Sequence, residues 1–260
     1  MNKVVVVKIG GAVFDGCDTT IEDVIALQKQ GKSLVIVHGG GGLVTEWLER
    51  REIATRFVHG ERATDMATLE VATAVLAGLV NKEIVAAVNN AGGKAVGISG
   101  VDGSLIQGRI KDKDLGYTGV VVKVDTALLE TLLRAGYIPV VSSISLHSFD
   151  RPDSASQILN INADPVAGEI AAAIGAERLI FLTDVPGIHD QSGKLLSGLT
   201  ANEAEILITS GVASGGMIPK IRACLRALAS VSTACIIDGR QPHALIKALE
   251  GKSGGTVISK

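Results

Sequence analysis

Short apolar runs alternate along the chain with segments of helical periodicity, and each run ends at a polar residue. The first run is VVVV at 4–7, four consecutive β-branched residues. Comparable runs occupy residues 34–37, 95–99, 137–142, 178–183 and 233–237. Runs without polar alternation are typical of strands that are buried on both faces of a parallel sheet. Strands separated by helices therefore predict an α/β protein with a largely parallel sheet.

Three segments between these strands have patterns of their own. Residues 66–79 have helical spacing, which breaks near Asn81 and then resumes. Residues 104–123 predict a polar excursion or hairpin at the surface. An Ala-rich helix is expected over Pro165–Ile174, with its proline at the favoured first position. Asp164 would then serve as a helix cap, but capping does not account for the two asparagines at alternate positions before it.

Two glycine-containing loops follow strands directly and are suited to an anion. Lys8 ends the first strand and Gly10-Gly11 follows, which places a cation beside adaptable backbone at the carboxyl end of a strand. Taken alone, this stretch is more simply a turn whose lysine points into water. The run Gly39–Gly42 connects a strand to a polar helix, the layout in which backbone N–H groups receive an anion. It is not a dinucleotide fingerprint, because position 44 is Val44.

The composition limits the classes of partner. Hydrophobic residues make up 47% and aromatic residues 3%, which suits buried strands and Ala-rich helices but not a surface that stacks nucleobases. A formal net charge of −2 provides no general attraction to nucleic acid or to an anionic membrane. No apolar run approaches the roughly 18 residues of a membrane span, and the N-terminus has no signal-peptide pattern. We expect a soluble cytoplasmic protein that binds neither nucleic acid nor membrane.

Neither a metal site nor a disulfide framework is indicated. Cys17, Cys224 and Cys235 are odd in number and lack CxxC spacing. Cys17 is expected to be an exposed thiol in a loop, and the other two cysteines to fill the core. The five histidines have no metal-ligand spacing.

Seven motifs, in order along the chain, resemble those of the amino acid kinase family, and within it those of the members that phosphorylate N-acetylglutamate. They are VKIGG (7–11), VHGGGG (37–42), GERATD (60–65), NINAD (160–164), TDVPGI (183–188), GGMIPK (215–220) and IDGR (237–240). The resemblance implies a three-layer αβα sandwich around an open, mainly parallel sheet. It also implies an N-terminal lobe (1–170) for the amino-acid substrate and dimerisation, and a C-terminal lobe (171–260) for ATP.

The resemblance assigns roles in phosphoryl transfer to individual residues. Lys8 and Lys220 would stabilise the transferring phosphoryl group, and Asp164 would hold both lysines in place. The backbone amides that would face the migrating group are those of Gly10, Gly11 and Gly41. Transfer to a carboxylate needs no protein nucleophile, because the acceptor is already an anion. It needs two anions held in line and neutralisation of their charge.

The resemblance also assigns two binding sites. N-acetyl-L-glutamate would be bound by Gly40, Gly41, Arg62 and Asn160, with Arg62 on its α-carboxylate. ATP would be bound by Gly10, Asp184, Val185, Gly187, Ile188, His189, Val212 and Ser214. Mg²⁺ would be carried by the phosphates of ATP, with no metal ligand from the protein.

Alternatives remain open at this point. The runs GYTG (116–119) and IQGRIK (106–111) resemble kinases that phosphorylate aminoadipate or glutamate on a carrier protein, whereas GGMIPK and IDGR are closer to enzymes for free acetylglutamate. Other carboxylate or carbamate kinases, and a non-catalytic amino-acid-binding regulatory module, are further possibilities. The chain begins at its first strand, without the extra N-terminal helix of arginine-sensitive hexamers. We therefore expect a homodimer that is insensitive to arginine.

Overall fold

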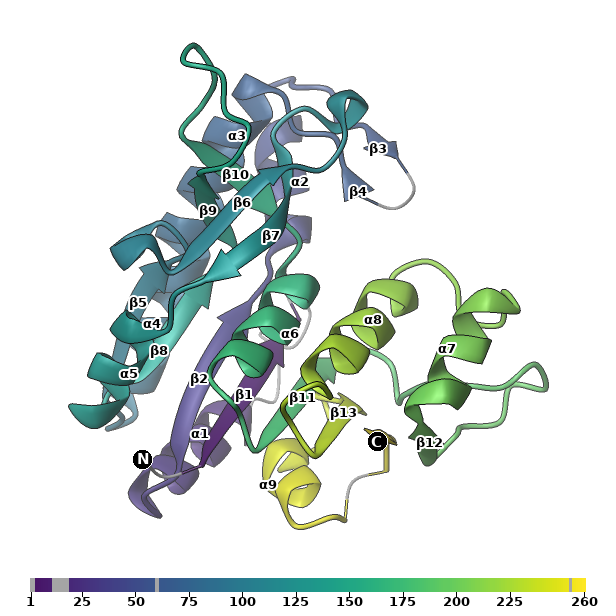
Figure 1. Cartoon of the computed structure of the whole chain (residues 1–260). Coiled ribbons are helices and arrows are strands. Elements are labelled where there is room, and N and C mark those ends of the chain that lie inside the picture. Colours follow the sequence, from purple (N-terminus) through teal and green to yellow (C-terminus); the bar gives the residue numbers. More distant parts are fainter. Residues whose placement is uncertain (1–2, 11–18, 59–60, 253) are drawn as a thin grey trace.

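The computed structural model describes residues 3–10, 19–58, 61–252 and 254–260, and an eight-stranded sheet forms its centre (Figure 1). The strands, in their order across the sheet, are β12 (Gly198–Thr200), β14 (Thr256–Ser259), β13 (Thr233–Asp238), β11 (Arg178–Thr183), β1 (Val4–Ile9), β2 (Ser33–His38), β8 (Ile138–Ser142) and β5 (Ala95–Ser99). All neighbours are parallel except β13 and β14. The predicted largely parallel sheet is confirmed.

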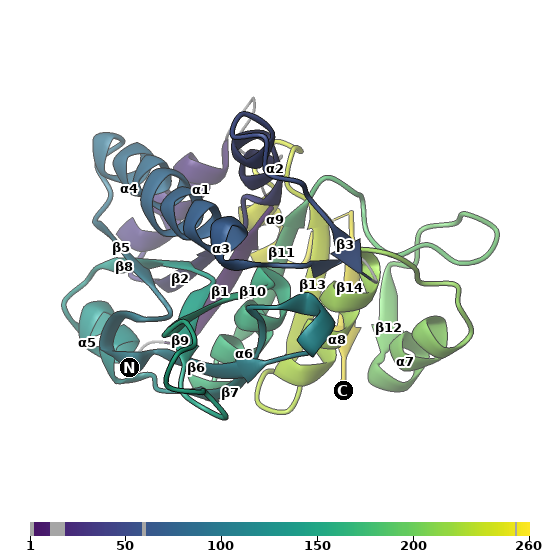
Figure 2. The same cartoon turned by 90° about the horizontal axis from the view of Figure 1, so that it is seen from above.

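Helices cover both faces of this sheet, which gives three layers (Figures 1 and 2). On one face lie α1 (Thr19–Lys29), α4 (Asn81–Asn90) and α9 (Ala244–Leu249). On the other face lie α5 (Ala127–Arg134), α6 (Ala163–Ala173) and α8 (Met217–Ala227). Helix α7 (Ala201–Thr209) packs against the edge strand β12. This is the αβα sandwich that the motifs imply.

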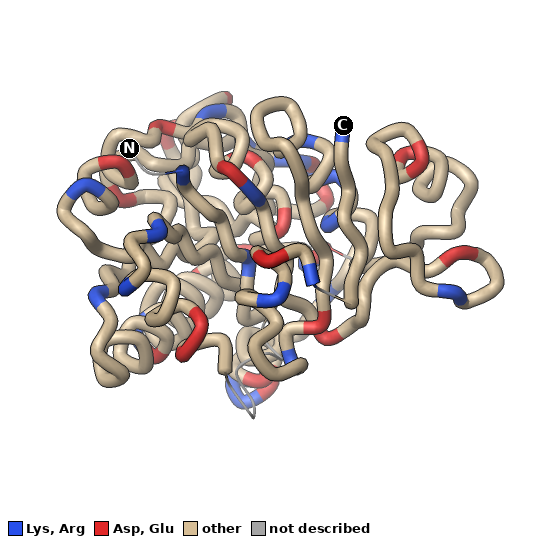
Figure 3. The backbone as a smooth tube through the Cα atoms, turned by 90° about the horizontal axis from the view of Figure 1, so that it is seen from below, with Lys and Arg blue, Asp and Glu red and all other residues tan. Residues whose placement is uncertain are grey.

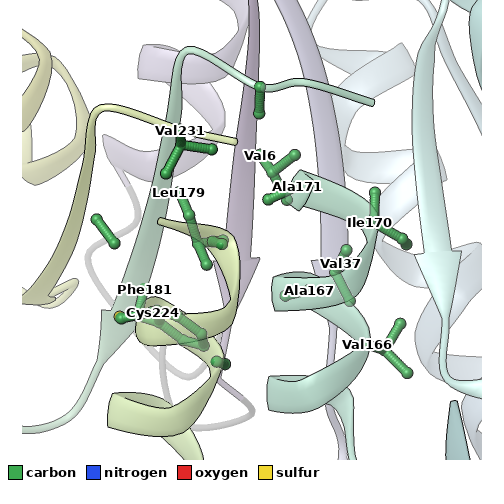
Figure 4. Close-up of a cluster of buried hydrophobic side chains, with 14 of the residues drawn as sticks. Val6, Val37, Val166, Ala167, Ile170, Ala171, Leu179, Phe181, Cys224 and Val231 are labelled. Atoms are coloured by element: carbon green, nitrogen blue, oxygen red, sulfur yellow. The ribbon is translucent and has the colours of Figure 1, made fainter. Parts of the chain in front are cut away.

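Strand β1 shows why an uninterrupted β-branched run belongs at the centre of the sheet. Successive side chains of a strand point to opposite faces. Val6 therefore packs in the cluster that includes α6 and α8, and Val7 packs in the cluster that includes α1 and α9. Both are 0% exposed. Figure 4 shows Val6 in the first of these clusters, with Ala171 of α6 and Leu179 of β11.

The two described cysteines lie in these clusters. Cys224 and Cys235 are free thiols and are buried, as predicted. Burial raises the pKa of each thiol, so neither is poised as a nucleophile. Cys17 lies outside the described residues.

A second, four-stranded sheet closes on itself beside the main sheet. It consists of β6 (Ile106–Ile110), β7 (Thr118–Val124), β9 (Ile144–His147) and β10 (Ile158–Ile161), with the short turns η3 (Asp102–Ser104) and η4 (Lys113–Leu115) nearby. The predicted hairpin exists as β6–β7, but it is not a surface excursion, because Ile106 and Thr118 are buried. Strands β9 and β10 were not predicted, since four-residue strands that mix polar and apolar residues have no clear pattern. The remaining elements are α2 (Gly41–Glu49), β3 (Phe57–Val58) and β4 (Glu61–Arg62).

Residues 66–90 form a continuous helical segment of three parts, α3 (Met66–Thr73), the π-helical η2 (Ala74–Val80) and α4. The predicted break near Asn81 is wrong. Asn81 is 0% exposed, so a polar residue occupies a buried position where the helical pattern requires an apolar one. The helix continues through the π-helical turns of η2 instead of ending. Such turns are frequent near functional sites.

The same segment has the length and apolar composition of a membrane span. Residues Met66–Asn90 meet that criterion, and 44% of the most apolar window is buried inside the protein. The core helix of a globular domain meets it equally well, and Leu76 and Ile84 pack in hydrophobic clusters. The segment contains no uninterrupted apolar run of roughly 18 residues. The search of the sequence for such runs therefore did not identify it.

Candidate active site

Lys8, Asp164 and Lys220 meet near the carboxyl end of β1. Asp164 lies in the first turn of α6 and Lys220 near the start of α8. Lys8 Nζ is 2.7 Å from Asp164 Oδ1, and Lys220 Nζ is 2.9 Å from Asp164 Oδ2. One carboxylate therefore bridges two ammonium groups. The structure brings together the three residues to which the resemblance assigns phosphoryl transfer.

This cluster is charged although it is buried. The side chains of Lys8 and Asp164 are 9% and 6% exposed. Burial alone would raise the pKa of Asp164, but the charges and hydrogen bonds of Lys8 and Lys220 outweigh it, so the pKa is lowered. Two ammonium groups and one carboxylate leave one positive charge in a largely dry site. Such a site favours an added anion.

Asn162, and not Asp164, caps helix α6. Its backbone is extended and its side chain accepts a hydrogen bond from the Asp164 N–H at 2.9 Å. The helix therefore starts at Ala163, and Pro165 occupies the third position instead of the predicted first. The prediction is wrong by two residues because asparagine caps a helix as well as aspartate does. The carboxylate of Asp164 is thereby left to the lysines.

A cavity of about 270 Å³ opens beside Lys8, between the glycine loop, the small sheet and the β3–β4 hairpin. The predicted substrate-binding residues Gly40, Gly41, Arg62 and Asn160 all line it. Its other polar lining residues are Glu61, Thr118, Ser143 and Asn162. We call it the acceptor cavity.

One edge of the Arg62 guanidinium is fixed and the other lacks a partner. Nη2 donates to Gly41 O at 2.9 Å and to Thr45 Oγ1 at 2.8 Å, and the group lies 4.9 Å from the ring centre of Phe57. Nη1 is buried without a hydrogen-bond partner among the described residues. Burial lowers the pKa of Arg62, yet a guanidinium stays protonated in proteins. An oriented, partly unpaired guanidinium is suited to a carboxylate.

Two threonines that the sequence reasoning missed support Arg62 and Asn160. Thr118 Oγ1 donates to Arg62 O at 2.6 Å and lies 3.0 Å from Thr64 Oγ1. Asn160 Nδ2 donates to Thr64 Oγ1 at 3.2 Å. Both threonines are buried. The available signal was weak: Thr64 lies within GERATD, and Thr118 lies within GYTG, which suggested a different acceptor.

The glycine loop presents backbone amides to the acceptor cavity. Gly40 has φ 145° and ψ 21°, a conformation open to glycine. Gly41 starts α2, whose first N–H groups have no acceptor within the helix. Gly10 differs, because its N–H donates to Leu182 O at 3.0 Å and so already has an acceptor. Gly11 lies outside the described residues.

The predicted nucleotide-binding residues lie on two loops, which we call the nucleotide loops. Asp184, Val185, Gly187, Ile188 and His189 follow β11, and Val212 and Ser214 lie between α7 and α8. Ile188 is 2% exposed and its N–H donates to Thr256 Oγ1 at 2.8 Å, so its side chain belongs to the core. Lys220 Nζ donates to Gly216 O at 3.3 Å, on the loop between α7 and α8 that carries Val212 and Ser214. No described hydrogen bond or ion pair joins the loop after β11 to Lys8 or Lys220.

A second cavity, of about 840 Å³, reaches the cluster from another side. Asp164 and Lys220 line it, and Asn162 and Glu61 line both cavities. Its remaining charges are paired in part, Lys111 with Glu61 and Arg226 with Glu169. Over the face drawn in Figure 3, basic and acidic positions are interspersed.

The donor set does not form a metal centre. Across the described part of the chain, no group of three or more His, Cys, Asp or Glu residues is placed to hold a metal ion. Both oxygens of Asp164 face lysine ammonium groups. The charge of this carboxylate is therefore already balanced by two cations.

The chain is similar to known proteins over its full length. Residues 3–238 match the amino acid kinase family. The chain is 52% identical over 260 residues to acetylglutamate kinase of Dehalococcoides mccartyi (strain CBDB1), covering 100% of this chain and 96% of that protein. Its structure resembles a Streptococcus mutans UA159 protein with a TM-score of 0.85 and 27% identity, covering 100% and 99% of the two chains. N-acetylglutamate synthase from Neisseria gonorrhoeae, complexed with coenzyme A and N-acetyl-glutamate, has a TM-score of 0.83 and 26% identity, covering 99% of this chain and 59% of that one.

Proposed function

Because the chain belongs to the amino acid kinase family, we propose that it transfers the γ-phosphoryl group of ATP to the side-chain carboxylate of N-acetyl-L-glutamate. The product is N-acetyl-L-glutamyl 5-phosphate, an intermediate of arginine biosynthesis. The relative that shares 52% of its residues over the full chain is named for this activity. A non-catalytic regulatory module would have no use for the complete set of charges around Asp164.

The observation that carries the proposal is that two cations of different kinds line one small cavity. Arg62 offers a buried, unpaired Nη1, and Lys8 offers an ammonium group next to glycine amides. N-acetyl-L-glutamate has two carboxylates. The guanidinium suits the α-carboxylate, which stays bound, and the lysine suits the side-chain carboxylate, which reacts.

The reaction is an in-line displacement. A side-chain carboxylate oxygen of the substrate attacks the γ-phosphorus, the bond from that phosphorus to the β–γ bridging oxygen breaks, and ADP leaves. No proton has to move. Lys8 and Lys220 approach the transferring group from two sides of Asp164 and offset the charge on its equatorial oxygens. The amide of Gly41 supports the acceptor end.

Mg²⁺ is expected to arrive with ATP. When bound, the ion neutralises part of the charge on the β- and γ-phosphates. The chain contributes the two lysines around Asp164, which complement that charge without holding the ion.

The nucleotide loops and the assembly extend the proposal. Residues 184–189 and 212–214 bind ATP mainly through their backbone, in a C-terminal lobe at 171–260. Residues 1–170 bind the acceptor and form the dimer. The protein is a cytoplasmic homodimer that arginine does not inhibit. Light scattering that gives a hexamer, or inhibition by millimolar arginine, would refute this last part alone.

The function is tested by an ATP-coupled assay that compares free N-acetyl-L-glutamate with glutamate, aspartate and aminoadipate. Hydroxylamine converts an acyl phosphate to a hydroxamate, which forms a coloured complex with Fe³⁺, so trapping identifies the product as well as the turnover. We expect N-acetyl-L-glutamate to have a kcat/KM at least tenfold above the other three acids. Greater activity with aminoadipate would indicate a different acceptor, and ATP binding without turnover would indicate a regulatory module.

A further inference from the structure

We propose that His38 is a positioning residue for this reaction. Held as a neutral ring with its proton on Nδ1, it fixes the Gly39 carbonyl so that the Gly40 N–H faces the acceptor cavity. His38 does not contact the reacting atoms in this scheme and acts through the peptide that follows Gly39. The kinetic part of the inference rests on the proposed function, whereas the structural part stands on hydrogen bonds alone.

The amide of Asn81 fixes the direction of the network. Its Nδ2 donates one N–H to Val140 O at 2.9 Å, with Ile98 O at the longer distance of 3.3 Å, which leaves the second N–H for His38. Its Oδ1 accepts from Lys82 Nζ at 2.9 Å. In the flipped orientation, the amide oxygen would face two carbonyl oxygens and the NH₂ group would face an ammonium. Carbonyls cannot donate and ammonium groups cannot accept. Nδ2 therefore lies on the side of His38.

Two hydrogen bonds then set the tautomer of His38. Its Nε2 lies 3.1 Å from Asn81 Nδ2, which can only donate, so Nε2 accepts and has no proton. Its Nδ1 lies 2.8 Å from Gly39 O, which can only accept, so Nδ1 carries the proton. Both contacts require the same neutral ring. His38 and Asn81 are 1% and 0% exposed.

The electrostatic surroundings keep this ring neutral. Burial is the main cause that lowers the pKa of His38 to about 4. The hydrogen bond to Gly39 opposes this effect, and the charges of Lys8 and Lys82 add to it. The ring therefore stays uncharged at neutral pH, and it does not compete with Lys8 for an anion.

The Gly39 carbonyl determines where the next N–H points. In a trans peptide the C=O and the following N–H point in opposite directions, and no cis peptide occurs in the described backbone. With Gly39 O turned to the buried ring, the Gly40 N–H points away from it. Gly39 and Gly40 line the acceptor cavity together with Lys8. The Gly40 N–H has no acceptor among the described residues, so it can donate to an anionic oxygen.

The segment η2 supports the same peptide from a second side. A Cβ at Gly40 would lie 2.9 Å from Leu76 Cδ2 and 3.2 Å from Val80 Cγ2. Val80 directly precedes Asn81, so one helical segment both contacts Gly40 and orients His38. This accounts for a buried asparagine at a position where the helical pattern predicts an apolar residue.

The tautomer is measured directly by long-range ¹H–¹⁵N correlation spectra of the whole ¹⁵N-labelled protein at pH 7.5. We expect the His38 signals of a neutral ring protonated at Nδ1, assigned by their loss in His38→Leu. A ring protonated at Nε2, or an imidazolium, would overturn the inference. This measurement does not depend on catalytic activity.

Two substitutions at position 38 separate positioning from packing. His38→Leu keeps an apolar volume but removes the donor to Gly39 O, and we expect kcat to fall about tenfold or more, with the KM for ATP changed less than threefold. His38→Asn places an amide donor close to the position of Nδ1, and we expect it to regain most of that loss. Full kcat in His38→Leu, or an equal loss in both variants after correction for folded fraction, would overturn the inference.

A second asparagine on α4, which is exposed where Asn81 is buried, provides a control for the loss of a side chain–backbone link. Asn81→Ala removes the donor to His38, whereas Asn89→Ala removes a comparable link, in which Asn89 Nδ2 donates to Ala95 O at 3.2 Å and Oδ1 accepts from Ala95 N at 2.7 Å. Positioning predicts that Asn81→Ala lowers kcat per folded molecule severalfold and that Asn89→Ala does not. Equal effects would mean that the network is structural only. If the parent protein makes no acyl phosphate from N-acetyl-L-glutamate, the proposed function fails, and the tautomer measurement still decides the inference.

Discussion

The acceptor cavity and the nucleotide loops are built in different ways. The cavity has side chains aimed by other side chains: Arg62 is held by Thr45, and Asn160 by Thr64. On the nucleotide loops, the Asp184 side chain is exposed. At Gly187 it is the backbone that packs closely against Thr256: φ is 155°, and a Cβ would lie 2.6 Å from Thr256 Oγ1.

Under the proposed function, the two regions recognise different ligands, and this accounts for the difference. A small acid with two carboxylates presents few atoms, so directional side chains must distinguish it from similar acids. A nucleotide is larger, and backbone groups and shape supply much of its recognition. Substitutions in the acceptor cavity should therefore change chemistry and acceptor affinity. Side-chain substitutions on the nucleotide loops should have smaller effects.

The largest effect is expected at the cluster that both regions share. Lys8→Met should lower kcat about a hundredfold or more, because one charge contact in the transition state is typically worth about 3 kcal/mol. The effect on either KM should be smaller, since the contact strengthens as the phosphoryl group moves. Steady-state kinetics with both substrates varied measure the two quantities.

A lysine at the opposite end of the neighbouring strand serves as the control for that substitution. Lys32 pairs with Glu177 at 3.8 Å, and its side chain is 44% exposed. Lys32→Met should keep kcat within a factor of about two, because surface ion pairs contribute little. Near-normal kcat in Lys8→Met would show that the lysine has no role in the transfer.

The unfolding free energy at acidic pH should report on the acceptor side of the molecule, because the buried His38 lies there. The pKa of His38 is lowered from 6.5 to about 4. Between these two pH values His38 is protonated in the unfolded chain but not in the folded chain. Its stabilising contribution is complete above pH 6.5 and is lost as the pH falls toward 4, by about 3 kcal/mol in total. Urea unfolding from pH 7.5 to pH 4 measures it.

His38→Leu should flatten the unfolding free energy over that interval. Asp164 contributes in a different interval, because its pKa is lowered below the ordinary value of 3.8, and its contribution is lost only as the pH falls through that lower range. An unchanged slope between pH 6.5 and 4 in His38→Leu would mean that the histidine is not buried as a neutral ring.

Arg62→Lys should weaken binding of the acceptor and leave binding of ATP nearly unchanged. The guanidinium uses Nη2 for Gly41 and Thr45 and keeps Nη1 for a ligand, and an ammonium cannot reproduce that fork. We expect the KM for N-acetyl-L-glutamate to rise about tenfold, with the KM for ATP within twofold. Arg56→Lys, on the same segment but bonded to Asp114 O, is the control. Equal increases in both KM values would place Arg62 outside the acceptor site.

The main sheet could be predicted from sequence because its strands are buried on both faces. Such strands, Val4–Val7 for example, need an unbroken apolar run, and a local pattern is enough to reveal it. The small sheet could not be predicted, since β9 and β10 are short and mix polar with apolar residues. The helix break predicted near Asn81 is wrong for a related reason. A polar residue can be buried inside a helix when it has hydrogen-bond partners there. The partners of Asn81, which are His38 and two strand carbonyls, are known only from the structure.

The site shows the same limit. Lys8, Asp164 and Lys220 were identified through motifs, but their meeting at one carboxylate depends on how α6 and α8 pack on the sheet. Thr64 lies within GERATD and Thr118 within GYTG, but neither motif predicts that the two side chains meet. Their importance arises from hydrogen bonds between segments 54 residues apart, and such pairings cannot be derived from either segment alone.

Gly187→Ala should weaken binding of ATP moderately and leave binding of the acceptor nearly unchanged. The methyl group would meet Thr256 Oγ1 at 2.6 Å and Thr256 N at 3.0 Å, at the threonine that accepts from Ile188 N. We expect the KM for ATP to rise about fivefold to tenfold, and the KM for N-acetyl-L-glutamate to change less than twofold. Gly193→Ala has a positive φ of 82° without any atom within 4 Å, so it separates the steric clash from backbone strain. Equal KM values for ATP in the two variants would remove the clash as the cause.

The smallest effect is expected for Asp184→Asn on the same loop. The side chain is exposed, and its charge acts on Arg240, whose pKa it helps to raise after the larger effect of Asp238. Exposed charge pairs are weak because solvent screens them, so the KM for ATP should rise threefold or less and kcat should stay within twofold. Isothermal titration with a non-hydrolysable ATP analogue measures the affinity directly. A tenfold loss would mean that ATP is read by side chains on this loop, and the contrast between a side-chain acceptor site and a backbone nucleotide site would no longer hold.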